Sequence, residues 1–462
     1  DGFTELPKLK NQTVGFRSFL KTSAYSKLTF EYHHLQEFRR GGDLLNRPPH
    51  EANIAEQLRH SINSGGLKFD YFSPDEKHRL SIGRDSYYGG NQDLNAYGAT
   101  KDFTWVAGSQ YIYHFDRCLF MPSDLTGGVE YNQDNLKDDM WGYNRYTNQK
   151  VRIAGAFFQN EWRNRQWSIL LGGRLDKHNL INHVIFSPRA NIRFNPVENV
   201  NLRASYSVGF RAPQAFDEDL HIENVGGTIS MIELADNLKE EKSQSFSVSA
   251  DVYHRWGAFQ GNFLLEGFYT NLSDVFALRE IGVRDGTIIN ERYNEKGAKV
   301  YGLTLEGKIA YLSLLQLQAG ITLQKADYKN ARTWSDDETV PMEKRIFRTP
   351  DTYGYFTLTY NPLKSLLVAL SGTYTGSMLV EHKAGYIEKD IAVNTPDFWE
   401  LNLKVGYDFT VYKNIGIQLN AGVRNIFNAY QKDFDRGSKR DSGYIYGPGM
   451  PRSYFAGVKI SY

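Results

Sequence analysis

The chain has 462 residues, a formal net charge of +1 and a single cysteine, Cys118. The near-balance of charges excludes a bulk electrostatic attraction to nucleic acid, and a lone cysteine excludes a fold held by intrachain disulfides. No window approaches the roughly 18 to 20 apolar residues of a membrane-spanning helix, which excludes a helical membrane protein. No export signal is visible at Asp1, which predicts a chain that is either cytoplasmic or already processed.

Apolar and polar residues alternate with a period of two along almost the whole chain, from "TVGFRSF" near the start to "SYFAGVKISY" at the end. In chain order, the clearest runs are 202–210, 246–252, 398–411, 415–423 and 454–462. Period two predicts β-strands with one apolar face. Runs of about ten residues exceed ordinary strands and suffice to cross a bilayer when tilted. Charged residues in mid-strand on the polar face are typical of transmembrane barrels with apolar residues toward lipid.

The connections between these strands alternate between short and long. Short turns of transmembrane barrels lie on the periplasmic side and long loops lie outside the cell. The predicted short turns are 73–78, 164–166, 195–199, 255–258 and 361–365, and the predicted long loops include 41–53, 131–149, 211–241 and 428–451. The count is about 19 strands, the first of which descends toward the periplasm. Because bacterial single-chain barrels have an even strand number, we expect residues 1–462 to be the C-terminal part of a longer all-β, antiparallel transmembrane β-barrel.

Four stretches, in order along the chain, resemble the TonB-dependent outer-membrane receptors. They are "GFRAPQAFDEDLH" with "DNLKEEKSQSFSVS", "NEKGAKVYGLTLEGK", "RNIFNAY" and "PRSYFAGVKISY". The resemblance covers more than half of the chain and implies a barrel of about 22 strands around an N-terminal plug. The plug, the TonB-binding motif and about three strands would then lie outside this sequence.

The same resemblance implies a function and partners. It implies energy-coupled import of a scarce metal chelate, namely a ferric siderophore, haem or cobalamin, across the outer membrane of a Gram-negative bacterium. The implied partners are the TonB-ExbB-ExbD complex, acting through the plug, with outer-membrane lipids, the barrel-assembly machinery and, as an option, a surface lipoprotein. A passive outer-membrane channel and a surface binding component of a membrane complex remain the alternatives.

Aromatic residues in the outer loops are candidates for contacts with a large planar or hydrophobic ligand. Tyrosine and tryptophan also concentrate at membrane interfaces, so a contact with lipid is the alternative for each of them. The candidates are Trp141, Tyr143, Tyr146, Trp334, Tyr386 and Tyr444, beside Tyr87, Tyr88 and Tyr446.

A second set of candidates follows from the resemblance. In haem receptors of this family, a FRAP box and an NPNL-like box bracket a histidine. Phe210–Pro213, His221 and Asn237 match this order, which implies that Arg211 and His221 bind ligand and that His221 is an axial haem ligand. FRAP-like boxes also occur in siderophore and cobalamin receptors, and "ADNL" departs from the full pattern, so a histidine on the loop or rim remains the alternative.

Three further expectations concern metal, assembly and catalysis. Asp134, Asp138 and Asp139 offer hard oxygen ligands that suit calcium, with a solvated acidic loop as the alternative. No covalent cofactor is expected. The last strand resembles a barrel-assembly signal through its alternating residues Tyr454, Val458, Ile460 and Tyr462. No GxSxG, HExxH, CxxC or phosphate-binding loop is present, so we expect no enzyme, although a Ser–His pair from separate strands would leave no spacing signal.

Overall fold

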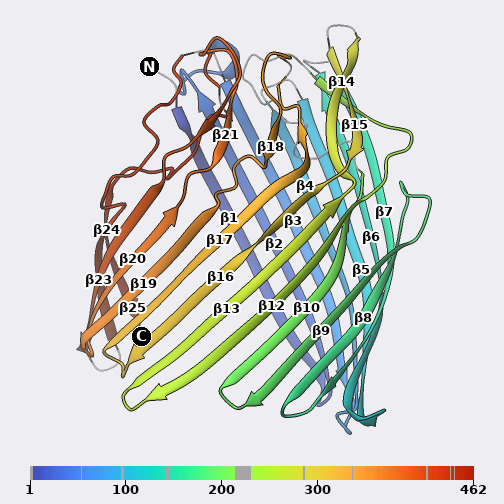
Figure 1. The fold of residues 1–462 in the computed structure, drawn as a ribbon, viewed down its shortest axis with the longest axis vertical. Helices are drawn as coiled ribbons and strands as arrows, with labels where there is room; N and C mark the ends of the chain where they lie inside the picture. The colour runs from blue at the N-terminus through green and yellow to red at the C-terminus, as the bar shows by residue number, and fades with distance from the viewer. Residues whose placement is uncertain are drawn as a thin grey trace.

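In the computed structural model, the chain forms one large antiparallel sheet whose strands run side by side in chain order (Figure 1). The structure describes residues 4–461 except 54, 95–97, 142–144, 214–229, 285–286, 336, 413–414, 438 and 442. Within these residues the sole helical element with bounds of its own is the short 3-10 turn η1 (Pro49–Glu51). No helix of the described chain is long and apolar enough to span a membrane.

The main sheet has 20 strands, one of which, β18 (Glu343–Arg345), is a three-residue piece beside β17. The other 19 are long, which confirms the predicted strand number for the described chain. They are β1 (Thr4–Ser23), β2 (Ser26–Gly42), β3 (Ala55–Phe72), β4 (His78–Leu94), β5 (Gly98–Cys118), β6 (Met121–Met140), β7 (Arg145–Arg163), β8 (Trp167–His178), β9 (Ile185–Val197), β10 (Val200–Arg211), β12 (Glu241–Trp256), β13 (Phe259–Ser273), β16 (Ala298–Tyr311), β17 (Leu315–Arg332), β19 (Thr352–Leu363), β20 (Leu366–Thr375), β23 (Phe398–Tyr412), β24 (Ile415–Arg424) and β25 (Ser453–Ser461).

Two small sheets lie in the long connections and were not predicted from the sequence. A three-stranded sheet pairs β15 (Thr287–Glu295) with both β14 (Val275–Arg284) and β11 (Ser230–Leu234). A hairpin pairs β21 (Leu379–His382) with β22 (Ile391–Asn394). Both lie at the end of the main sheet that carries the long loops (Figure 1).

Register keeps one face of the main sheet apolar from strand to strand. Tyr206, Phe246, Tyr269 and Tyr301 stand directly opposite one another across β10, β12, β13 and β16. Lower on the same face, Trp256 pairs with Phe259, which pairs with Tyr311.

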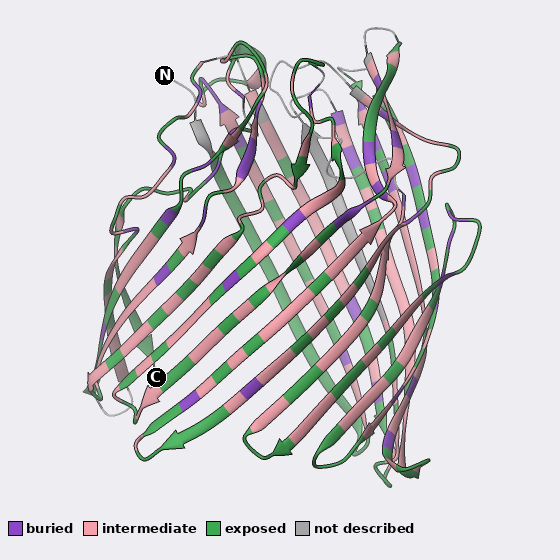
Figure 2. Ribbon diagram, in the orientation of Figure 1, coloured by how far each residue is buried: buried purple, intermediate pink, exposed green. Residues whose placement is uncertain are grey.

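These two aromatic rows mark the depth of the membrane. Phe246 and Trp256 belong to the same strand, and their separation corresponds to about 33 Å of strand, or roughly 25 Å of height at a tilt of about 40°. That height matches the apolar band of a transmembrane barrel. Figure 2 shows few buried residues on the long strands, as expected for an apolar face that meets lipid.

The connections follow the predicted alternation with one correction. The five short turns lie between strand ends at the positions predicted, and the connections around 41–53, 211–241 and 428–451 are long. The predicted loop 131–149 is wrong in extent, because β6 continues to Met140 and β7 begins at Arg145. Strands that project into water have polar residues on both faces, so their alternation between apolar and polar residues fades although the ladder of hydrogen bonds continues.

Glycine is required where the sheet backbones approach most closely. Gly297 has φ +108°, and a Cβ there would lie 2.0 Å from the carbonyl oxygen of Leu272. A Cβ at Gly302 would lie 2.3 Å from the carbonyl oxygen of Leu323. At Gly307 the nearest atoms would be 3.5 Å away, an ordinary contact. The backbone therefore requires glycine at the first two positions, whereas the third has room for an alanine.

Candidate functional site

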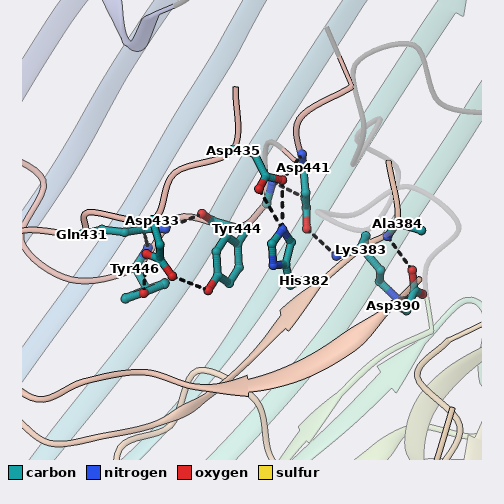
Figure 3. A network of polar contacts seen from close by, with 11 residues as sticks. His382, Lys383, Ala384, Asp390, Gln431, Asp433, Asp435, Asp441, Tyr444 and Tyr446 are labelled. Carbon is teal, nitrogen blue, oxygen red and sulfur yellow. Dashed lines mark hydrogen bonds and ion pairs between the residues drawn. The ribbon is translucent and has the colours of Figure 1, made fainter. Parts of the chain in front are cut away.

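Two long connections at the outer end of the sheet pack together (Figure 3). Residues 376–397 join β20 to β23, and residues 425–452 join β24 to β25. Their contact encloses a small cluster of buried side chains, against which Met378, Val393 and Ala429 also pack. The cluster consists of Val380, Phe398, Tyr444 and Tyr446.

His382, the last residue of β21, links the two connections. Its Nε2 lies 2.9 and 3.0 Å from the two carboxylate oxygens of Asp435, and both side chains are buried. The imidazole stacks on the ring of Tyr444 with 3.7 Å between centroids and 5° between planes. An Nε2–H that donates to a carboxylate fixes the orientation of the ring. His382 is thus held by one polar and one aromatic contact from the other connection.

Asp433 lies between two tyrosine hydroxyls (Figure 3). Tyr444 donates to it at 2.8 Å and Tyr446 at 2.6 Å. Partial burial opposes ionisation of Asp433, but the hydrogen bonds from Tyr446 and Tyr444 outweigh it and hold the pKa of this carboxyl below its usual range. Burial, together with the contact to Asp433, raises the pKa of Tyr446 to about 12. Both shifts favour a carboxylate that accepts from neutral phenols.

A third connection, between β17 and β19, joins the network through Lys383. The ammonium of Lys383 donates to the carbonyl oxygen of Trp334 at 2.6 Å and lies 4.9 Å from the centre of its indole ring. The backbone N–H of Lys383 donates to Asp441 at 2.7 Å. In the same hairpin, the N–H of Ala384 donates to Asp390 at 2.7 Å. Three connections that are distant in sequence therefore share one set of contacts.

Arg348 ties the start of β19 to the last loop. Arg348 has a backbone φ of +58°. Its guanidinium donates to the carbonyl oxygen of Ile445 at 2.8 Å and to that of Gly443. These contacts give Arg348 an architectural role. The planar guanidinium carries several N–H donors and can therefore bind two carbonyl oxygens of one turn.

Several side chains of these connections are exposed outside this network, among them a phenol and three cations. Tyr386 is 54% exposed, and the neighbouring Gly385 lies so close to the last loop that a Cβ there would be 2.6 Å from the carbonyl oxygen of Lys439. Lys432, Arg436 and Lys439 are exposed, and the described part of the chain offers none of them an ion pair. An exposed phenol beside several cations suits an anionic, aromatic ligand.

The predicted ligand residues fall into separate regions. Tyr444 and Trp334 lie in the loop network, with Tyr444 buried and its hydroxyl already donating to Asp433. Tyr386 is exposed beside them. Their contacts with a ligand stay predictions.

Arg211 lies elsewhere, at the outer end of β10. Its guanidinium is 3.7 Å from the carboxylate of Glu241 and 5.6 Å from the ring centre of Phe276. His221 and Tyr143 lie outside the described residues, and so does Tyr462. Tyr454, Val458 and Ile460 share the exposed apolar face of β25, and their role as an assembly signal is still a prediction.

The residues predicted for calcium belong to a strand and not to a loop. Asp138 and Asp139 are consecutive in β6 and therefore point to opposite faces. Asp138 is buried and accepts a hydrogen bond from Thr100 at 2.6 Å, whereas Asp139 pairs with Lys137 at 2.7 Å. Asp134 shares the face of Asp138. Among the described residues no group of three or more His, Cys, Asp or Glu side chains is placed to hold a metal ion, and calcium here stays a prediction.

Trp141 and Tyr146 flank the turn of the same hairpin and are 56% and 55% exposed. Tyr146 stands opposite Asp139, on the face that continues downward as the lipid-facing surface. This position favours the interfacial alternative for Tyr146 over a contact inside the mouth.

Sequence reasoning missed the residues at the centre of the network, namely His382, Asp433, Asp435 and Lys383. The phenols of "SGYIYG" drew attention to Tyr444, but no spacing connects His382 with Asp435, which is 53 residues away. The available signal was weak: a histidine after "LVE", in a loop facing a second loop rich in aspartate.

Comparison with known families decides what this barrel is. Residues 8–426 match the family described as TonB dependent receptor-like, beta-barrel. The chain belongs to this family of outer-membrane receptors. The match covers the sheet from β1 to β24 and the first connection of the loop network, residues 376–397. The family is one of receptors and transporters and not a class of enzymes.

Solved receptors share the fold at low sequence identity. The siderophore receptor PirA from Acinetobacter baumannii aligns at 15% identity with a TM-score of 0.72, over 99% of this chain and 72% of that one. A mutant of the ferric enterobactin receptor PfeA from Pseudomonas aeruginosa aligns at 15% identity and 0.72, over 98% and 69%. The ferric-catecholate import receptor Fiu from E. coli aligns at 14% and 0.70, over 98% and 75%. No curated protein matches in sequence.

Proposed function

We propose that this TonB-dependent receptor barrel imports a ferric siderophore of the catechol type, coupled to TonB. The observation that carries the proposal is the exposed group at the outer mouth, where Tyr386 lies beside the loop of Lys432, Arg436 and Lys439. A ferric catecholate is anionic and aromatic, so it complements these cations and this phenol. The names of PfeA and Fiu, which share the fold, are in line with this ligand class.

The buried network gives the proposed site its shape. His382, Asp435 and Tyr444 satisfy one another inside the loops, so the exposed cations project from a framework that is already ordered. Preorganised loops reduce the entropy lost when a ligand binds. The network is therefore a support, and the exposed side chains are the ligand contacts.

A binding titration tests the ligand class. The full-length protein is titrated with ferric enterobactin, haem and cobalamin, and quenching of its intrinsic fluorescence is followed. We expect ferric enterobactin to bind tightest. Changing Lys432, Arg436 and Lys439 together to glutamine weakens that binding by about tenfold, or about 1.4 kcal/mol. The matched control is Lys364→Gln, in the short turn between β19 and β20 at the other end of the sheet. This variant leaves the binding of ferric enterobactin unchanged.

The remaining alternatives give distinct outcomes. If haem binds tightly and His221→Ala abolishes this binding, the ligand is haem and not a siderophore. A constitutively open pore in single-channel recordings of the full-length protein indicates a passive channel. Uptake of the ferric chelate by cells that lack TonB contradicts the coupling. Binding without any uptake favours a surface binding component.

A further inference from the structure

The lipid-facing surface of β2 to β8 is hollowed. The hollow has a volume of about 840 Å³ and lies almost wholly between apolar side chains. Its floor consists of small residues in neighbouring strands, where Ser109 of β5 stands opposite Val129 of β6, and Val129 opposite Ala156 of β7. Its walls are Leu67, Phe69, Ile82, Tyr131 and Leu175. This volume falls in the range of ligand sites, about 300 to 1,000 Å³.

Basic side chains stand at the upper end of the hollow, on the same face. Register places Lys177 opposite Ala154, Arg152 opposite Gln133, and Lys150 opposite Asn135. Lys101 stands directly opposite Lys137. All five cations are exposed.

These cations lack a matching set of acids. Lys137 pairs with Asp139 at 2.7 Å, but within the described residues none of Lys101, Lys150, Arg152 and Lys177 forms an ion pair. The ammonium of Lys177 donates to the carbonyl oxygen of Ile181. Like charges directly opposite each other across two strands destabilise a sheet. Asp139 relieves this repulsion at Lys137, whereas no acid of the described chain pairs with Lys150, Arg152 or Lys177, so an external anion would stabilise these three.

The same level on the other side of the sheet is balanced. There Lys299 stands directly opposite Asp327, and Lys325 lies 3.5 Å from the carboxylate of Asp327. A second, smaller hollow of about 550 Å³ lies below these residues. An excess of positive charge above a hollow is thus a property of the β5–β8 sector, not of the outer rim as a whole.

The depth of the cations identifies what they meet. Trp105 and Tyr131, whose rings are 5.1 Å apart, mark the outer aromatic belt on β5 and β6. Gln133 stands opposite both Trp105 and Arg152, so Arg152 lies at the level of this belt. Aromatic belts sit at the lipid headgroups, where basic side chains meet phosphates.

We propose that the β2–β8 sector binds a phosphorylated, multi-chain lipid of the outer leaflet. Its acyl chains fill the hollow above Ser109 and Ala156, and its phosphates lie among Lys150, Arg152 and Lys177. A free phosphate is a poor occupant because it leaves the apolar hollow unfilled, and an uncharged lipid leaves the cations unmatched. The proposal is independent of which chelate the receptor imports.

Lipid binding to the full-length protein in detergent tests the proposal. The probe is bis-phosphorylated hexa-acyl lipid A, and the bound lipid is counted by native mass spectrometry. We expect one lipid A per protein to be retained. The Lys150→Gln, Arg152→Gln, Lys177→Gln variant retains at least about tenfold less, and dephosphorylated lipid A binds the unaltered protein about tenfold more weakly.

Two further variants separate lipid binding from folding. Lys299→Gln with Lys325→Gln removes the same kind of charge from the balanced sector and is expected to leave lipid retention unchanged. Ala156→Leu fills the hollow without altering charge and is expected to lower retention. Heat-dependent mobility on gels confirms that each barrel is folded. Equal retention by the triple variant, or equal loss in the control pair, overturns the proposal.

Discussion

The main sheet and the outer loops of this receptor barrel are stabilised in different ways. The sheet relies on long backbone ladders, such as the continuous pairing of β12 with β13 from Lys242 to Trp256. The loops instead rely on side chains, with His382, Asp433 and Asp435 joining segments that are distant in sequence. We infer that a change in the sheet affects the whole barrel, whereas a change in the network affects the loops alone.

The largest expected effect comes from breaking the sheet. Gly297→Val forces a side chain into the carbonyl of Leu272 at a residue with positive φ. We expect a loss of at least about 3 kcal/mol, enough to abolish assembly. The readout is the amount of folded barrel in the outer membrane. Gly307→Ala, whose Cβ would make an ordinary contact of 3.5 Å with Phe263, is the control, and a normal yield of the Gly297 variant would contradict the expectation.

A smaller and local effect is expected from His382→Ala. The variant removes the imidazole from the buried carboxylate of Asp435, which still accepts from the backbone N–H of Asp441, so we expect a loss of about 2 kcal/mol in loop docking. Hydrogen exchange in 376–397 and 425–452 should accelerate while exchange in the strands stays slow. The exposed neighbour variant Tyr386→Ala should change neither. Faster exchange throughout the strands would show that loops and sheet are not independent.

Lowering the pH tests, through Asp433, whether the loops can come apart while the sheet stays intact. Because the pKa of this carboxyl is lowered in the folded loops, its contribution is present above the ordinary pKa of about 3.9 and is lost as pH falls below it. Proteolysis of the last loop should therefore accelerate as the pH falls below about 4. Asp433→Asn should weaken docking at neutral pH and flatten this dependence. An unchanged acid profile in the variant would rule out Asp433 as the titrating group.

The smallest effect is expected from Tyr446→Phe, which removes one hydrogen bond worth about 1 kcal/mol. With its pKa raised to about 12, Tyr446 stabilises the docked loops fully below its ordinary pKa of about 10 and loses this contribution as pH rises through the raised value. The absorbance difference between unaltered protein and variant should show a tyrosinate step near the raised pKa. A step near the ordinary value would contradict the buried contact with Asp433.

The membrane part of the fold was predictable because burial there follows a simple rule. Alternating runs such as 398–411 and 415–423 face lipid on one side, and the structure pairs them in register. Prediction failed where strands leave the bilayer. Residues 131–149 look like a loop because water solvates both faces of the β6–β7 hairpin, so no apolar period remains to reveal it.

The candidate site was less predictable because its contacts are not periodic. Tyr444 and Trp334 stood out as aromatic residues in long loops, and both belong to the network. His382 and Asp435 carry no local signal, since their pairing depends on how two irregular segments fold over each other. Only three-dimensional contacts could reveal that these two residues pair.

The order of the strands has a consequence for how the barrel is made. Each long strand pairs with its nearest long neighbours along the chain, without a crossover. Pairings that close short loops lose little chain entropy, so a barrel wall can grow one hairpin at a time. The long outer loops are not needed for this growth, which leaves their sequences free to change with the ligand while the wall continues to assemble.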